Sequence, residues 1–306
     1  MEALGWFFAN LWAGISGIFI ALFNPGAWLG WLIPSITGGE TDFTSLMRFI
    51  FYGASTELFF AIFAVMVTIG VVGVFYRPFL WGVVRANEAF QNVIGRFFAW
   101  AALIMVLQQV MIVFLQRIFR ESAISFGAGD VIFTRDVSWW SEELKLYNAM
   151  LVALCVGYTF VQGGHVRVDL FYAGMRFRAK KVVDMLGSLI FLMPLTVIIW
   201  LFSWFFLWRS MINPPVSPTD TLDRLMTKAR AVRWNIETIG FSPNGFDQYW
   251  MFKVLILSFA ATMFLMAWGF FFRSLLEFIE GPESENKYLV KDSLGDEIAE
   301  TAAEIH

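Results

Sequence analysis

The chain alternates long uncharged stretches with short charged ones. Four uncharged stretches cover residues 97–116, 146–164, 185–208 and 254–272. The hydrocarbon core of a bilayer is about 30 Å thick, so about 20 apolar residues in a helix cross it with every backbone amide satisfied inside the segment. The pattern therefore predicts four membrane-spanning helices.

Two more apolar stretches precede these four. The nearer one predicts a helix over about 49–76 that includes a charged residue, Glu57. The other covers residues 3–39 and is interrupted at 24–26 by Asn-Pro-Gly, which is a turn signal. We expect a helix over about 6–23, followed by a segment at the membrane interface that contains Trp28 and Trp31. Because the sequence leaves open whether this helix crosses the bilayer, the total is five or six spans.

The positions of Lys and Arg predict how the chain is oriented in the membrane. Loops 77–96 and 165–184 are rich in these cations and are expected on the cytoplasmic side. Loop 117–145 balances cations against acids and is expected outside. Loop 209–253 is also basic, but long loops cross the membrane with less regard for charge. The acidic C-terminal tail, 283–304, is then cytoplasmic.

Two segments have the pattern of helices that lie in the membrane plane or pack on a partner protein, and the sequence does not separate these alternatives. In residues 78–95 one face is apolar, whereas Arg85, Asn87, Glu88 and Gln91 are expected to face away from the membrane. Residues 221–236 repeat the pattern with Leu222, Leu225, Met226, Ala229, Val232 and Ile236.

Composition places the chain among membrane proteins. It is 58% hydrophobic and 15% charged, with a mean hydropathy of +0.64. The net charge of -3 argues against a nucleic-acid partner, because a basic surface is needed to neutralise phosphates. The single cysteine, Cys155, excludes a disulfide framework and a thiolate metal site.

Polar groups that could carry chemistry inside the membrane are scarce. Gln108 and Gln109 point to different faces of one span, so at most one can face a neighbouring helix. The two histidines, His165 and His306, lie outside the spans, which argues against paired haem ligands. The chain also lacks a phosphate-binding loop, a nucleophile elbow and matched broken helices. We therefore expect no enzyme activity and no cofactor, and a bundle almost free of buried ionisable groups that serves another protein.

One short block stands apart from this apolar pattern. In QGGHVRVDLF, residues 162–171, two glycines suit the end of a span, and polar residues then alternate with apolar ones. From the residues alone, this is an ordinary basic flank in which Arg167 reaches lipid headgroups.

The block GGHVRVDLFY, followed by RAKKVVDMLGSLIFLMP, resembles the small membrane subunit of tripartite ATP-independent periplasmic (TRAP) transporters, the DctQ-type or Q component. Three further stretches agree in order and spacing with the first, second and fourth spans of that family: IGRFFAWAALIMVLQQVMIVFLQRIFR, WWSEELKLYNAMLVALCVGYTFVQ and FDQYWMFKVLILSFAATMFLMAWGFFFRSL. The likeness covers about residues 90–280.

This resemblance implies a four-helix subunit of the bacterial inner membrane with its C-terminus in the cytoplasm. It implies a non-catalytic scaffold for a large membrane subunit that carries the substrate and sodium sites. A periplasmic binding protein would deliver an organic acid, commonly a carboxylate. The resemblance implies that certain motif residues either have structural roles or contact phospholipid headgroups or the large subunit. These residues are Glu143, His165, Arg167, Asp169 and Tyr172.

The expected fold is thus an all-α integral membrane protein that is larger than the family pattern. It divides into an N-terminal membrane extension at 1–80, a DctQ-like domain at 81–280 with an outer-loop insert at 210–245, and an acidic tail at 281–306. A membrane anchor or assembly subunit of an unrelated complex would explain the spans equally well. The sequence does not name the transported substrate or the copy number.

Overall fold

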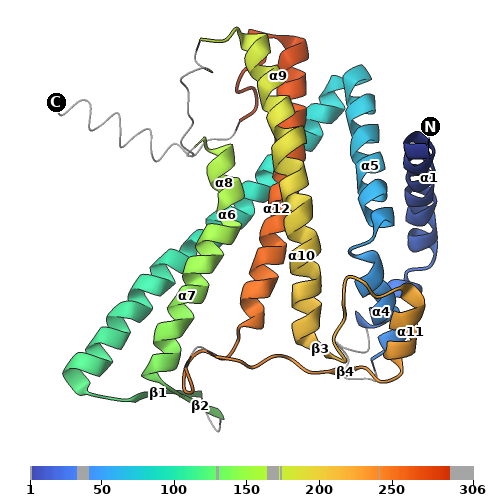
Figure 1. Cartoon of the computed structure of the whole chain (residues 1–306). Helices are drawn as coiled ribbons and strands as arrows, with labels where there is room; N and C mark the ends of the chain where they lie inside the picture. Colours follow the sequence, from blue (N-terminus) through green and yellow to red (C-terminus); the bar gives the residue numbers. More distant parts are fainter. Residues whose placement is uncertain are drawn as a thin grey trace, which may run out of the picture. The chain divides into compact units, whose positions relative to one another are not determined.

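A computed structural model describes residues 2–32, 41–128, 131–163, 172, 174–240 and 242–289 (Figure 1). Regular structure in these ranges is mostly helical, which confirms the expected all-α class. The strands form two short antiparallel pairs. One pairs β1 (Ala123–Ala128) with β2 (Val131–Asp136), and the other pairs β3 (Ile212–Asn213) with β4 (Arg233–Trp234).

Within the described ranges, six helical segments are long and apolar enough to cross a membrane. They are α1 (Glu2–Phe23), α5 (Thr56–Phe75), α6 (Arg77–Val113) with a π-helical end at Phe114–Phe119, α7 (Val137–Leu154) with α8 (Val156–Val161), α9 (Phe177–Gly187) with α10 (Met193–Met211), and α12 (Trp250–Glu280). A π-helical turn, Ser188–Leu192, joins α9 to α10. Five of the predicted spans fall on one of these segments each, and the helix predicted over 49–76 falls on α5 only from Thr56 onward.

The chain forms two compact units. The first unit combines Met1–Phe75 with Val197–Leu257, and the second combines Tyr76–Thr196 with Ser258–His306. Helices α10 and α12 contribute residues to both. The N-terminal extension up to Phe75 and the outer-loop insert, which the sequence places far apart, therefore belong to one unit.

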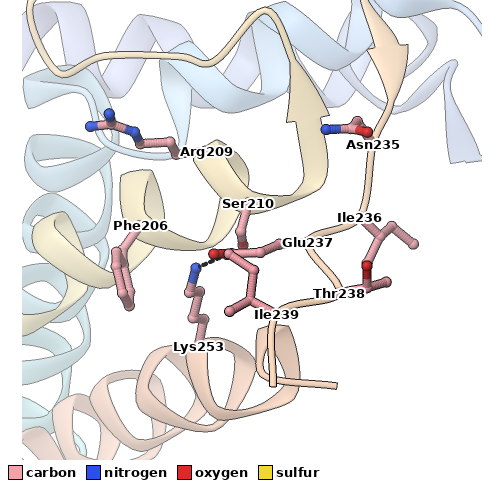
Figure 2. Close-up of a pocket in the computed structure, with 9 residues that line it drawn as sticks. All are labelled: Phe206, Arg209, Ser210, Asn235, Ile236, Glu237, Thr238, Ile239 and Lys253. Carbon is pink, nitrogen blue, oxygen red and sulfur yellow. Dashed lines mark hydrogen bonds and ion pairs between the residues drawn. The ribbon is translucent and has the colours of Figure 1, made fainter. Parts of the chain in front are cut away.

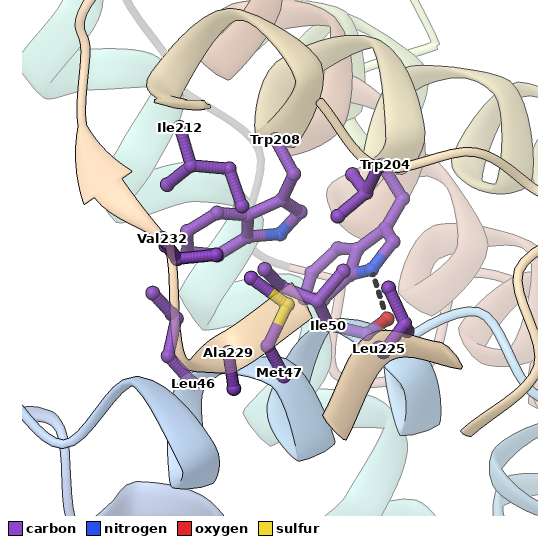
Figure 3. Packing of buried hydrophobic residues seen from close by; sticks show 10 residues of the cluster. Leu46, Met47, Ile50, Trp204, Trp208, Ile212, Leu225, Ala229 and Val232 are labelled. Carbon is purple, nitrogen blue, oxygen red and sulfur yellow. Dashed lines mark hydrogen bonds between the residues drawn. The ribbon is translucent and has the colours of Figure 1, made fainter. Parts of the chain in front are cut away.

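The core of the first unit joins these two additions (Figure 3). Three residues of α4 (Phe43–Tyr52), Leu46, Met47 and Ile50, pack with residues of α10 and of the insert: Trp204, Trp208, Ile212, Val216, Leu225, Ala229 and Val232. The indole Nε1 of Trp204 donates to the backbone oxygen of Ile50 at 2.8 Å. Because every member is buried, this cluster is an apolar core of the first unit.

The helix expected over 49–76 is interrupted in the structure. Helix α4 ends before Gly53, whose carbonyl oxygen accepts a hydrogen bond from Trp200 Nε1 at 2.8 Å. The hydroxyl of Ser55 then accepts from the backbone amide of Leu58 at 3.1 Å, as an N-cap does, and α5 begins. The hydrophobic pattern of residues 49–76 did not predict this break. The break coincides with the Ser55 cap and with the hydrogen bond from Trp200 to Gly53.

Trp28 and Trp31, expected at the membrane interface, flank this core. Trp28 belongs to the short helix α2 (Gly26–Leu29), and both rings lie against Phe49, with centroids 6.2 Å and 5.3 Å away. Upstream, α1 packs on α5 so closely at Gly14 that a Cβ there would lie 2.7 Å from the backbone nitrogen of Ala61. Small residues allow such close approach between membrane helices.

Helix α6 corrects two expectations for residues 78–95. The segment is not a separate interfacial helix, because α6 continues through it without a break to Val113. Arg85 is exposed as expected and Asn87 is half-buried, but Glu88 and Gln91 are buried, whereas the apolar residues Phe79, Phe90 and Val93 are exposed. Glu88 and Gln91 therefore face neighbouring helices, as uncommon polar groups inside a membrane bundle usually do.

The outer-loop helix is also shorter than expected. Helix α11 (Leu222–Ala229) begins at Thr221, whose hydroxyl accepts from the Arg224 amide at 3.4 Å, and it ends well before residue 236. Strand β4 follows and pairs with β3. The apolar face of α11 is buried in the core of its own unit, which replaces both the interfacial and the partner-docking interpretation of Leu225 and Ala229.

Candidate functional site

Glu143, a predicted motif residue, joins α7 to α6. Gln108 Nε2 donates to Glu143 Oε2 at 3.1 Å and to the backbone oxygen of Trp140 at 2.9 Å. The hydroxyl of Tyr147 donates to the other carboxylate oxygen of Glu143 at 3.2 Å. Gln108 is buried and Gln109 is exposed, so the prediction that only one of them can face a neighbouring helix is confirmed. Glu143 therefore has a structural position between two spans.

Tyr172, a second motif residue, is bound to α9. Its hydroxyl donates to Asp184 Oδ2 at 2.8 Å, and the ammonium of Lys180 lies 5.4 Å from the centroid of its ring. The remaining motif residues, His165, Arg167 and Asp169, lie outside the described residues.

A buried ionic cluster, which the sequence did not reveal, joins α6, α9 and α12 in the second unit. Arg273 of α12 donates through Nε and Nη2 to the two carboxylate oxygens of Glu88, at 2.6 Å and 2.8 Å. Its Nη1 donates to Glu277 at 3.4 Å, and Lys181 of α9 pairs with Glu277 at 2.6 Å. Glu88, Arg273 and Glu277 are 7%, 8% and 3% exposed. The expectation of a bundle almost free of buried ionisable groups was therefore wrong.

The four side chains of the ionic cluster balance one another in charge, and Lys181 also lies 4.0 Å from the carboxylate of Glu285. The cluster carries two positive and two negative charges, and each anion has a cation within hydrogen-bonding distance. Arg273 Nη1 also donates to the backbone oxygen of Lys287 at 3.2 Å, and the guanidinium lies 5.4 Å from the ring centroid of Trp81. An ionic cluster of this kind holds its helices in one arrangement, because buried charges are stable only when each lies close to an opposite charge or a hydrogen-bond partner.

A seam of amide groups continues from the ionic cluster along α6 and α12. Asn87 Nδ2 donates to the backbone oxygen of Leu265 at 2.8 Å, and Gln91 Nε2 donates to that of Thr262 at 2.9 Å. Gly269 lies directly against Asn87, where an added Cβ would be 2.0 Å from Nδ2. These contacts use polar groups for helix packing. In the described residues no group of three His, Cys, Asp or Glu side chains could hold a metal ion.

Asp220 anchors the start of α11 in the first unit. Its carboxylate pairs with Lys228 at 2.6 Å and Arg224 at 3.2 Å, and it accepts from the Ser217 backbone amide at 2.9 Å. Burial raises the pKa of Asp220, but the hydrogen bonds from Lys228 and Ser217 and the nearby positive charges outweigh it and hold the pKa below its ordinary value.

We expect Asp220→Asn to loosen α11, because the amide keeps the shape but loses two charge pairs. The loss is about 1.5–3 kcal/mol, which would speed amide exchange in Leu222–Ala229 tenfold or more. Since the folded pKa is lowered, the stabilisation is present above about pH 4 and is lost as the pH falls through the lower folded value. Hydrogen exchange across that range, corrected for intrinsic rates, should show wild type and variant converging at low pH. The exposed neighbour Asp223→Asn is the control, and an equal acceleration in it would contradict the assignment.

Comparison with known proteins identifies one region of the chain. Residues 130–229 match the family model described as "Tripartite ATP-independent periplasmic transporters, DctQ component". The match runs from the residue before β2 to the last residue of α11, and it contains all five motif residues named from the sequence. The resemblance recognised in the sequence is confirmed over this region. Neither the curated proteins nor the solved structures gave a match.

Proposed function

Because residues 130–229 carry a DctQ-type region, a component of TRAP transporters, we propose that the chain is the non-catalytic scaffold subunit of a sodium-coupled secondary transporter. A large membrane subunit would carry the substrate and the coupling ions. A periplasmic binding protein would deliver an organic acid of the carboxylate class. The DctQ match is the observation that carries this proposal, since it covers the segment from α7 to α11.

The way the chain uses its buried charges supports a scaffold role. A protein that moves a polar solute keeps ionisable groups open to a path through the membrane. Here Glu88, Arg273, Glu277 and Lys181 bind one another, and Glu143 binds Gln108 and Tyr147. These charges are occupied in holding helices together, which suits a rigid support for a moving partner.

The proposed location is the bacterial inner membrane with the C-terminus in the cytoplasm. The basic start of α9, with Arg176, Arg178 and Lys180, suits the cytoplasmic side. Alternation of spans then places the end of α12 on that same side. With six spans the N-terminus would also be cytoplasmic.

The motif residues divide into two roles in this proposal. Glu143 and Tyr172 stabilise the subunit itself, since their side chains bind Gln108 and Asp184. His165, Arg167 and Asp169 are proposed to contact the large subunit or phospholipid headgroups, as expected for a polar block directly after a span.

The test is joint expression of this chain with a multi-span protein and a secreted binding protein from its neighbouring reading frames, where the proposal expects both to be encoded. We expect the multi-span protein to co-purify with the chain in mild detergent. Sodium-dependent uptake of a radiolabelled carboxylate into proteoliposomes should require all three proteins. Uptake by this chain alone, or uptake that survives its omission, would rule out the scaffold role. An anchor of an unrelated complex would co-purify with other proteins and leave uptake unchanged.

A further inference from the structure

A polar cavity lies in the first unit where α10 ends and α12 begins (Figure 2). Its volume is about 460 Å³, within the roughly 300–1,000 Å³ range of small-molecule sites. The lining comes from the last turns of α10, the segment after β4 and the first turn of α12, and it includes Phe206, Arg209, Ser210, Glu237, Ile239 and Lys253. Backbone bonds hold the wall in place, since the amide of Glu237 donates to the Ser210 carbonyl oxygen at 2.8 Å.

The cavity is lined by two cations, Lys253 and Arg209, and one anion, Glu237. Lys253 forms an ion pair with Glu237, and its ammonium lies 4.2 Å from the ring centroid of Phe206. Arg209 is exposed, lies apart from that pair in Figure 2, and makes no ion pair with any residue that the structure describes. The cavity therefore presents a free guanidinium, whose donors are arranged to bind a phosphate through two parallel hydrogen bonds.

An exposed apolar stripe on α10 leads directly to Arg209. Ile198, Phe202 and Phe206 precede it at spacings of four, four and three residues, so the four side chains share one helix face. All three apolar residues are exposed, Phe202 to 77%. Because α10 belongs to a segment that is long and apolar enough to cross a membrane, this stripe suits contact with hydrocarbon, and Arg209 at its end suits the level of the headgroups.

We propose that this cavity binds one anionic glycerophospholipid. Its phosphate is held by Arg209, and an acyl chain lies along Phe206 and the exposed Phe202. Exposed Ile239 covers the chain from the opposite wall. A free inorganic anion would use the guanidinium but not this apolar path. The site combines the end of α10 and the start of α12 with residues of the outer-loop insert, and it is independent of the transport proposal.

The test is lipid retention by the purified full chain in detergent, read by native mass spectrometry with phosphatidylglycerol as the probe. We expect one retained phosphatidylglycerol, little phosphatidylcholine, and no displacement by inorganic phosphate. Arg209→Gln should weaken retention roughly tenfold, because a charge-assisted pair is lost. Ile239→Asn should also weaken it without changing the charge. Arg230→Gln, which removes an exposed cation of the same loop outside the cavity, should bind as wild type.

Several outcomes would overturn the proposal. Equal retention in Arg209→Gln, equal retention of phosphatidylcholine, or displacement by inorganic phosphate would each exclude an anionic lipid at this cavity. Thermal unfolding in lipid-free detergent checks that Arg209→Gln is folded, and Ile239→Asn provides the test if it is not. Since no other subunit is present, the result does not depend on whether the chain supports transport.

Discussion

Replacing Arg273 with methionine is expected to lower the free energy of unfolding by about 3–5 kcal/mol. The side chain keeps much of its apolar length, but Glu88 loses both of its hydrogen bonds and Glu277 keeps only Lys181. Uncompensated charge in a buried site costs more than the ion pair itself contributes. Reversible unfolding in mixed micelles of increasing dodecyl sulfate content measures the change.

The matched control is Arg77→Met, the same substitution at an exposed position of α6 in the same unit. It should change stability by less than about 0.5 kcal/mol. Adding Glu88→Gln to Arg273→Met should recover part of the lost stability, because a neutral amide then replaces the carboxylate that has no cation. If Arg273→Met costs no more than Arg77→Met, the ionic cluster does not hold α6 to α12.

Gly95→Ala is expected to destabilise the second unit by about 1–3 kcal/mol. A Cβ at Gly95 would lie 2.1 Å from Cβ of Tyr158, and the root of a side chain cannot move aside without its helix. The carbonyl oxygen of Gly95 also accepts from the Cys155 thiol at 3.4 Å, so separation of α6 from α8 would weaken that contact too. The same unfolding titration applies, and cysteine labelling should report faster access to Cys155.

Gly82→Ala is the matched control, since it makes the same substitution in the same helix. It should raise the free energy of unfolding, where Gly95→Ala lowers it. Gly82 is exposed, and no atom lies within 4 Å of a Cβ built there. Alanine should stabilise this position by about 0.5–1 kcal/mol, since glycine loses more conformational freedom in a helix. Destabilisation of equal size in both variants would show that helix propensity, and not the contact with Tyr158, sets the cost at Gly95.

The sequence predicted the spans well because their cause is local. Each predicted span reflects a requirement for about 20 apolar residues, which is readable one segment at a time. The helix ends were less accurate where a distant group decided them. Gly53 accepts a hydrogen bond from Trp200, and the resulting break between α4 and α5 was not visible in the hydrophobic pattern of residues 49–76.

The orientation of α6 shows a second limit. Its pattern of apolar and polar residues was correctly identified, but the polar face was assigned to the outside because an interfacial helix was assumed. The partners of Glu88 and Gln91 are Arg273 and Thr262, more than 170 residues away. One sequence without homologues contains no signal that pairs such positions. Of the candidate site, Glu143 and Tyr172 form hydrogen bonds with Gln108 and Asp184, and their role in the motif stays a prediction. The ionic cluster was missed.

By itself, then, the sequence determined that this is a helical membrane protein with a DctQ-type region and where its spans lie. It could do so because span length and a contiguous motif are properties of short stretches. Only the tertiary structure decided which charges are buried together, and that α4 and α11 share the core containing Trp204 and Trp208. Those pairings depend on distances in space between residues far apart in the chain. The hydrophobic pattern of a helix does not say which other helix its apolar face packs against.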